Sequence, residues 1–309
     1  QSAKLESIEE YVPNLIARVT VFESEKSDEQ ELLADDLDKE DQEKEIEEEA
    51  FLSNGKMITL LLPNGLEQIG NNAFRRNRLL REVALPHSIC KVGSGCFSEC
   101  EVLEAAYLSK QLKVIPENMF RSDRHLKKVL FTKDSQLETI EGFAFYDCNA
   151  LEVILLPAGV QEIGDKAFYR CKNLKTVRFP KGLKRIGREA FNFCKVQQLD
   201  LPDTLEEIGM EAFYFCGFET IVLPKEIKKL DQRAFFGCKK LKEVYIPENI
   251  MYLGEEVFHG CNRLEYLEIH HDPEHIGSKI VNKNCTIRCK KGSKVDLYCE
   301  EQGLKREYI

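Results

Sequence analysis

The sequence predicts an α/β repeat solenoid, a right-handed superhelix of about ten coils of 22–25 residues with short parallel strands. Three observations lead to this fold class. A unit of about 23 residues recurs through most of the 309-residue chain, its apolar residues recur at the same places, and a proline preceded by an apolar residue opens most copies. A unit this short cannot bury its own apolar face, so it must stack on its neighbours.

Aligned on the proline, the unit reads L-P-x-x-L-x-x-I-G-x-x-A-F-x-x-C-x-x-L-x-x-V-x. Ser109 and Thr132 replace the proline in two copies, and Glu40 opens a degenerate first copy. We therefore expect an N-terminal strand and acidic helical segment over 1–39 (a cap or linker), the solenoid over 40–270 and a C-terminal capping segment over 271–309. Clear copies begin at Pro63, Pro86, Pro157, Pro180, Pro202, Pro224 and Pro247.

Each repeat is expected to contain two short extended pieces and a tight turn. In one copy, residues 174–180 predict a strand whose alternate side chains point inward. Residues 183–187 predict a second extended piece that bends at glycine, and residues 190–194 predict a tight helical turn. Residues 58–62 are also expected to form a strand. A glycine column requires either positive φ or close backbone approach; it comprises Gly70, Gly93, Gly164, Gly187, Gly209 and Gly254.

The first 50 residues differ from the repeats in composition. Residues 15–22 predict a strand, and residues 30–50 predict a helix with Ser27 as its N-cap. Between Glu23 and Ala50 there are 15 acidic residues and three lysines, a local charge of −12, so the rest of the chain carries +3 of the net charge of −9. A solvated acidic face or linker is favoured over a cap on the first coil.

One phenylalanine recurs at the same position in every copy, starting with Phe51. Stacked coils would align these rings into a continuous buried spine, which is a core feature rather than a functional site. The other members are Phe74, Phe97, Phe120, Phe145, Phe168, Phe191, Phe213, Phe235 and Phe258.

Seven of the twelve cysteines occupy one repeat position, three residues after the spine phenylalanine. Asn77 and Asp123 take that position in two copies. A ladder of buried free thiols is favoured over a series of disulfides, and it indicates a reducing or anaerobic setting. The seven are Cys100, Cys148, Cys171, Cys194, Cys216, Cys238 and Cys261.

Outside the acidic segment the chain is nearly neutral, and no basic stripe with interleaved aromatic residues occurs, so nucleic-acid binding is not expected. No apolar run is long enough to span a membrane. The first residue is Gln rather than Met, which indicates a removed signal peptide or a boundary within a longer chain.

The repeat unit resembles the BspA-like leucine-rich repeats of bacterial cell-surface proteins and of some parasitic protists. Residues 291–305 resemble the closing segment of that family, a helix that ends in glycine and is followed by a short strand. The resemblance covers residues 40–309. It implies a leucine-rich-repeat solenoid and a role in adhesion or in binding proteins or host surfaces, although many members have no known role.

No catalytic or cofactor motif is present, so we expect a protein that is not an enzyme and that uses no cofactor. The densest cluster of chemically active side chains is His270–His275 with Cys285 and Cys289. His271, His275 and the two cysteines could form a zinc site. Pro273 would break a helix that aligned the histidines, however, and a polar capping turn is favoured.

The outward residues of the predicted strands form a column along the stack. Its N-terminal half is apolar, which is typical either of a contact surface or of cross-strand packing. Among these residues, Tyr107, Leu130, Leu155, Arg178 and Tyr245 are the candidate partner-binding positions. The full column is Leu61, Ala84, Tyr107, Leu130, Leu155, Arg178, Asp200, Val222, Tyr245 and Glu268.

These features favour a non-enzymatic, monomeric binding module that presents a rigid strand face to a protein or a glycan. The alternative is a structural spacer within a larger surface protein. The resemblance implies a cell-surface or secreted location, whereas the many unpaired thiols favour the cytoplasm.

Overall fold

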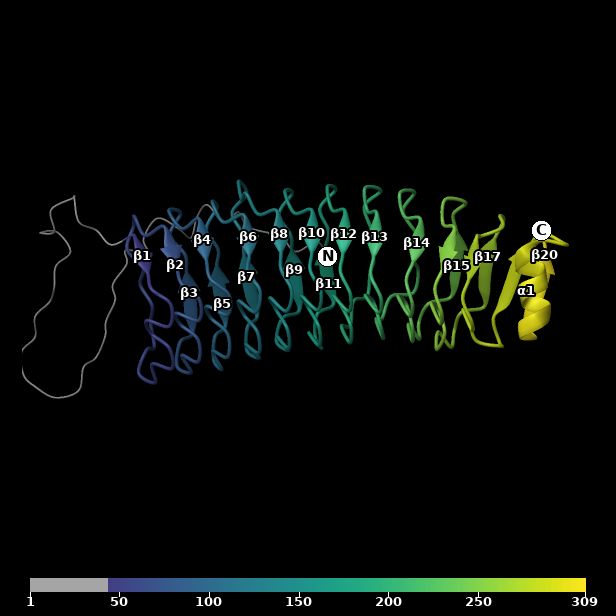
Figure 1. Ribbon diagram of the computed structural model, residues 1–309. Helices are drawn as coiled ribbons and strands as arrows, with labels where there is room; N and C mark the ends of the chain where they lie inside the picture. Colours follow the sequence, from purple (N-terminus) through teal and green to yellow (C-terminus); the bar gives the residue numbers. More distant parts are fainter. Residues whose placement is uncertain (1–43) are drawn as a thin grey trace, which may run out of the picture.

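The computed structural model describes residues 44–309, which form an elongated stack of about 11 coils (Figure 1). The predicted repeat solenoid is therefore confirmed. Each coil passes along two strand-bearing sides, and a tight corner joins them. The expected strand at residues 15–22 lies outside the described residues, as does most of the expected helix at 30–50.

One side of the stack, which we call the strand face, carries the longer strands. They are parallel and form three separate ladders, β3–β5–β7, β9–β11 and β15–β17–β19–β20. Their bounds are β3 Glu82–Ala84, β5 Ala105–Tyr107, β7 Lys128–Leu130, β9 Val153–Leu155, β11 Thr176–Arg178, β15 Glu243–Ile246, β17 Tyr266–Ile269, β19 Thr286–Cys289 and β20 Lys305–Tyr308.

The other strand-bearing side, which we call the short-strand side, carries two-residue strands that are also parallel. They form the ladders β1–β2–β4 and β6–β8–β10–β12–β13–β14–β16–β18. Equivalent apolar residues are in register, so that Ile140, Ile163 and Ile186 align and are buried. The bounds are β1 Glu45–Ile46, β2 Gln68–Ile69, β4 Lys91–Val92, β6 Val114–Ile115, β8 Thr139–Ile140, β10 Glu162–Ile163, β12 Arg185–Ile186, β13 Glu207–Ile208, β14 Lys229–Leu230, β16 Tyr252–Leu253 and β18 His275–Ile276.

The glycine column follows the short strands and marks a close approach of backbones. A Cβ on Gly93 would lie 2.4 Å from the backbone N of Asn71, and a Cβ on Gly164 would lie 2.7 Å from the backbone N of Gly142. None of the six column glycines has a positive φ. Of the two reasons that the sequence allowed for glycine, close approach is therefore the one that applies.

The corner is not the helical turn that the sequence predicted. The residues two before and two after the spine phenylalanine have positive φ, for example Asn72 at 54° and Arg76 at 62°. Backbone N–H groups of alternate residues donate to the next coil instead of to their own turn. Phe74 N donates to Cys96 O over 2.9 Å, and Arg76 N donates to Ser98 O over 2.9 Å. These bonds between coils compensate for a conformation that costs an L-residue about 1–2 kcal/mol.

Three further expectations are wrong in detail. The helix expected to reach Ala50 is replaced from Glu45 onward by β1 and a turn, because these residues pair with the following coil. Residues 58–62 form no strand, although Leu60 and Leu62 are buried. The strand face is interrupted between β11 and β15, where residues 196–201 and 218–223 run without strand pairing.

The C-terminal end matches the predicted helix and strand. Helix α1, Lys294–Gln302, is the only α-helix within residues 44–309. Ser293 caps its start by accepting a hydrogen bond from Asp296 N, and Gly303 ends it in the left-handed conformation with φ 62°. The chain then forms β20, which pairs with β19 at the end of the stack (Figure 1).

Candidate functional site

The spine phenylalanines lie along the axis of the stack. From Phe51 to Phe258 each ring stacks on the next, with centroids 5.0–5.9 Å apart and ring planes within 15° of parallel. Phe51 is half-buried, and the other nine rings are fully buried. Each ring fills the space between two coils, so the spine couples neighbouring repeats.

The seven cysteines of the repeat position are buried beside this spine, and all twelve cysteines of the chain are free thiols. Each thiol points back at the preceding coil. The Cys148 Sγ donates to Phe120 O over 3.1 Å, and the Cys171 Sγ donates to Phe145 O over 3.0 Å. Burial raises the pKa of the Cys148 and Cys194 thiols well above the ordinary value. These thiols are therefore protonated and unreactive at neutral pH.

The polar residues at the cysteine position make equivalent contacts. Asn77 Nδ2 donates to Phe74 O over 2.7 Å and to Phe51 O over 2.9 Å. Asp123 is fully buried and accepts one hydrogen bond at Oδ1, from Cys100 N over 2.7 Å. Burial raises the pKa of Asp123 well above its ordinary value. The common role of this position is thus to form hydrogen bonds with backbone groups of adjacent coils.

The candidate partner-binding residues lie on the strand face, but they do not form one continuous row. Tyr107 pairs with Leu130 across β5 and β7, and Leu155 pairs with Arg178 across β9 and β11. Tyr245 lies on β15, beyond the interruption. Tyr107, Leu130 and Leu155 are half-buried, whereas Arg178 is exposed and Tyr245 is 46% exposed. The apolar part of the column is therefore partly covered by its own neighbours.

Charged residues beside this column are paired from coil to coil. Lys127 Nζ lies 2.8 Å from Glu104 Oε2, and Lys242 Nζ lies 2.8 Å from Glu219 Oε2. Both pairs are exposed to solvent, so they contribute little to stability. They make the flank of the column polar and alternating in charge.

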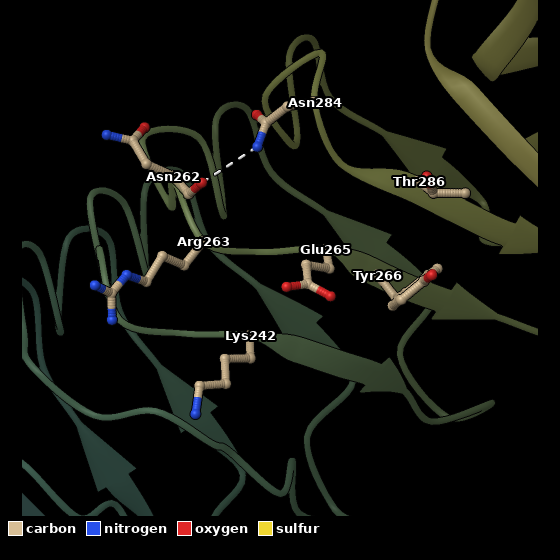
Figure 2. A pocket seen from close by; sticks show the side chains of 7 residues that line it. All are labelled: Lys242, Asn262, Arg263, Glu265, Tyr266, Asn284 and Thr286. Atoms are coloured by element: carbon tan, nitrogen blue, oxygen red, sulfur yellow. Dashed lines mark hydrogen bonds between the residues drawn. The ribbon is translucent and has the colours of Figure 1, made fainter.

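A shallow depression of about 510 Å³ lies beside the starts of β15, β17 and β19. Figure 2 shows Lys242, Arg263 and Glu265 on one side of it, with Tyr266 and Thr286 on the strands. Asn284 Nδ2 donates to Asn262 O over 3.2 Å along its rim. Its lining is polar and carries both signs of charge, so it suits a hydrogen-bonding partner rather than an apolar ligand. Asn262 and Asn284 complete the lining.

A second depression, of about 880 Å³, lies at the interruption between β11 and β15. Gln198, Asp200, Thr220 and Val222 contribute to its lining, and Val222 is 80% exposed. The sequence contains a signal for this interruption, a change in repeat length, but the interruption was not predicted from it. The copies that begin at Pro180 and Pro202 have 22 residues, one fewer than the copies on either side of them. Ile221 is still buried and Val222 still exposed, so the side chains keep their faces although the strand pairing is lost.

The residues of the suggested zinc site lie in separate environments. His271 Nε2 contacts Ile250 O at 2.7 Å, and the His275 ring stacks on Tyr252 with centroids 4.4 Å apart. Cys285 and Cys289 are buried. Within residues 44–309, no group of three or more His, Cys, Asp or Glu side chains is arranged to hold a metal ion. The same part of the chain contains no helix with the length and apolar character needed to cross a membrane.

Comparison with known proteins identifies the repeat. The BspA type leucine-rich repeat region, in six copies, matches residues 44–175 and 161–288. No curated protein sequence matches the chain. A leucine-rich repeat protein from Bacteroides ovatus has a similar structure, with a TM-score of 0.66 and 25% identity over 79% of this chain. The chain spans 64% of that structure.

Two other solved structures are similar at lower scores. A leucine-rich cell surface protein from Faecalibacterium prausnitzii has 24% identity and a TM-score of 0.49, with 86% of this chain and 76% of that one covered. The pneumococcal vaccine antigen PcpA has 19% identity and a TM-score of 0.46 over the same shares. Since the family match covers most of the described residues, the chain belongs to the BspA-type leucine-rich repeat family.

Proposed function

We propose that the chain is a non-enzymatic binding module that presents its strand face to a protein partner. The observation that carries this proposal is the column of outward residues on parallel strands, apolar from Ala84 to Leu155 and flanked by polar ion pairs. An apolar strip with a polar surround is the composition of a protein-binding surface. The strands are already ordered, so little conformational entropy is lost on binding.

The resemblance to bacterial cell-surface repeat proteins supports a further part of the proposal, that the module works at the cell surface or after secretion. Adhesion through a surface glycan is the variant of this function that the polar depression near Tyr266 favours, because its amide and hydroxyl groups suit a hydroxyl-rich ligand.

A structural spacer is the second candidate. The elongated stack favours it, because coils added in one direction separate β1 from α1 at the two ends of the stack (Figure 1). A spacer would need no partner on its strand face, which gives the two candidates opposite expectations for surface variants.

The test is binding of the purified chain to an array of secreted and cell-surface proteins, followed by affinity measurement on any protein that binds. We expect the variant Tyr107→Asp/Arg178→Glu/Tyr245→Asp, which changes the apolar column and two exposed positions beyond it, to weaken binding at least about tenfold. Tyr252→Asp on the short-strand side is the matched control and should change it less than about twofold. A partner whose affinity is unchanged by the strand-face variant, or an array with no binder, would contradict the proposal.

A further inference from the structure

An aromatic cluster covers the outside of the corner in the coils from Phe145 to Phe235. It is formed by side chains one or two residues after the spine phenylalanine, and it faces solvent rather than the core. We call it the corner cluster; its members are Tyr146, Tyr169, Phe193, Tyr214, Phe215 and Phe236. The rings form two sets. Tyr214 stacks on Phe236 at 4.9 Å, and Phe193 stacks on Phe215 at 5.8 Å, with Phe193 standing at 78° to Tyr214.

Phe193 and Phe215 are the two unusual members. Phe193 is 44% exposed and Phe215 is 36% exposed, and both have positive φ, 61° and 57°. A bulky aromatic residue is poorly suited to this backbone conformation. Their positions do not require an aromatic side chain, because other coils carry Ser122 or Gly237 at the equivalent place with the same sign of φ. The fold thus tolerates these residues without needing them.

The corner holds the two rings in fixed positions before any partner arrives. Phe193 N donates to Tyr214 O over 2.9 Å, and Phe215 N donates to Phe236 O over 2.8 Å. Gly237 leaves room for the Phe215 ring, since a Cβ there would lie 3.0–3.1 Å from three of its carbon atoms. Exposed aromatic side chains that are ordered in advance are the usual anchors of protein interfaces.

The acidic and basic groups near the corner cluster differ in their pairing. Acidic groups are neutralised within the solenoid: Glu211 lies 3.5 Å from Arg233, and Glu256 lies 2.6 Å from the same guanidinium. Three exposed lysines, each four residues after a spine phenylalanine, form no ion pair with any residue in 44–309: Lys172, Lys195 and Lys239. The Lys239 Nζ lies 5.5 Å from the Phe215 ring centroid. The free charge beside the aromatic rings is therefore positive.

We propose that the corner cluster is a second interaction surface, separate from the strand face, and that it binds an acidic protein segment with aromatic or other apolar side chains. The apolar side chains of the segment contact Phe193 and Phe215. Its carboxylates pair with Lys172, Lys195 and Lys239, which adds affinity and favours this partner over neutral or basic ones.

The test uses a displayed library of random twelve-residue peptides. The peptides are selected on the purified chain and counter-selected on Phe193→Ser/Phe215→Gly. These substitutions copy Ser122 and Gly237, so the variant should fold, which circular dichroism and a thermal melt check. We expect the enriched peptides to be net negative and to contain aromatic or leucine residues.

Fluorescence anisotropy then measures the best peptide against each variant. We expect at least about tenfold weaker binding for Phe193→Ser/Phe215→Gly, a smaller loss for Lys195→Ser/Lys239→Ser, and less than about twofold change for Val222→Ser and Tyr107→Asp. These two controls lie on the strand face, so their result separates this surface from the proposed function above. The proposal is overturned by neutral or basic peptides, by no enrichment, or by an anionic polysaccharide that binds with the same dependence on Phe193 and Phe215.

Discussion

The corner of the solenoid is built on the same backbone throughout, yet its outside differs between the two halves of the stack. In the coils of Phe74 and Phe97, Arg75 and Arg76 both pair with Glu99. In the coils of Phe191 and Phe213, the equivalent outer positions hold Phe193, Tyr214 and Phe215. Both sets of side chains occur with the same φ angles and the same hydrogen bonds between coils, so the backbone does not determine which residue types occupy the outer corner.

This difference distinguishes residues that stabilise the repeat from surface residues that the repeat does not require. The spine ring, the close-approach glycine and the buried polar or thiol position recur in both halves, and their substitution should affect stability. The outer corner side chains vary, so their substitution should affect recognition more than stability. Four predictions test this division.

The largest effect is expected at the spine, and it should be similar in both halves. Phe97→Ala and Phe168→Ala each remove a fully buried ring that stacks on two neighbours. Each should lower the free energy of unfolding by about 3–5 kcal/mol in urea denaturation. Leu79→Ala, at a side chain that is 45% exposed, is the control and should cost about 0.5 kcal/mol or less. A cost below about 1 kcal/mol in either half would show that the spine does not couple the coils there.

The next effect concerns the glycine column. Gly164→Ala places a Cβ 2.7 Å from Gly142 N and 2.8 Å from Glu141 C, so two coils must move apart. We expect a loss of about 1–3 kcal/mol in the free energy of unfolding. Gly182→Ala is the matched control, because its Cβ would meet only Ala158 O at 3.8 Å. Equal effects of the two substitutions would contradict the close-approach explanation.

A pH-dependent effect is expected at Asp123, which takes the cysteine position in the first half. Burial raises the pKa of its carboxyl above the ordinary value of 3.8. A raised pKa in the folded state means that its stabilisation is complete below about pH 3.8 and is lost as the pH rises through the folded value. Asp123→Asn copies Asn77 and should raise the free energy of unfolding at pH 7 by about 1–3 kcal/mol.

The control for this substitution is pH itself. At about pH 2.5, more than one unit below the ordinary value of 3.8, the carboxyl is almost fully protonated in both states, so the advantage of Asp123→Asn should largely disappear. Chemical denaturation at the two pH values measures the difference. An advantage of the same size at both values would mean that packing, rather than charge, limits this position.

The sequence was sufficient to predict the solenoid, because a recurring Phe and Leu-Pro step require stacked coils whatever the detailed turn. It could not predict the corner. Residues such as Asn72 and Arg76 have positive φ only because carbonyl groups of the next coil accept hydrogen bonds from their N–H groups. These bonds join two repeats, so the residue pattern of a single repeat does not predict them. The predicted helical turn followed the local spacing of Ala190 and Cys194, and local spacing does not report these bonds.

The strand-face residues illustrate the same limit. Tyr107 and Leu130 could be placed in one column from the repeat alone, and the register pairs them. Their half-burial depends on how closely adjacent side chains pack, which the repeat pattern does not specify. The interruption near Val222 was visible only as two successive copies that are one residue shorter than their neighbours. Val222 still faces solvent and Ile221 is still buried, so the faces are unchanged, and the loss of strand pairing depends on the adjacent coils.

The smallest effect is expected at the outer corner, where the two halves differ most. Phe215→Gly removes ring packing worth about 0.5–1.5 kcal/mol. It also removes the strain of a non-glycine residue at positive φ, which is of similar size and opposite effect on stability. We expect the free energy of unfolding to change by less than about 1 kcal/mol in urea denaturation. A larger loss would assign Phe215 to the structural set together with the spine. A near-zero change, combined with the binding loss expected above, would leave recognition as the reason for an exposed phenylalanine at this corner.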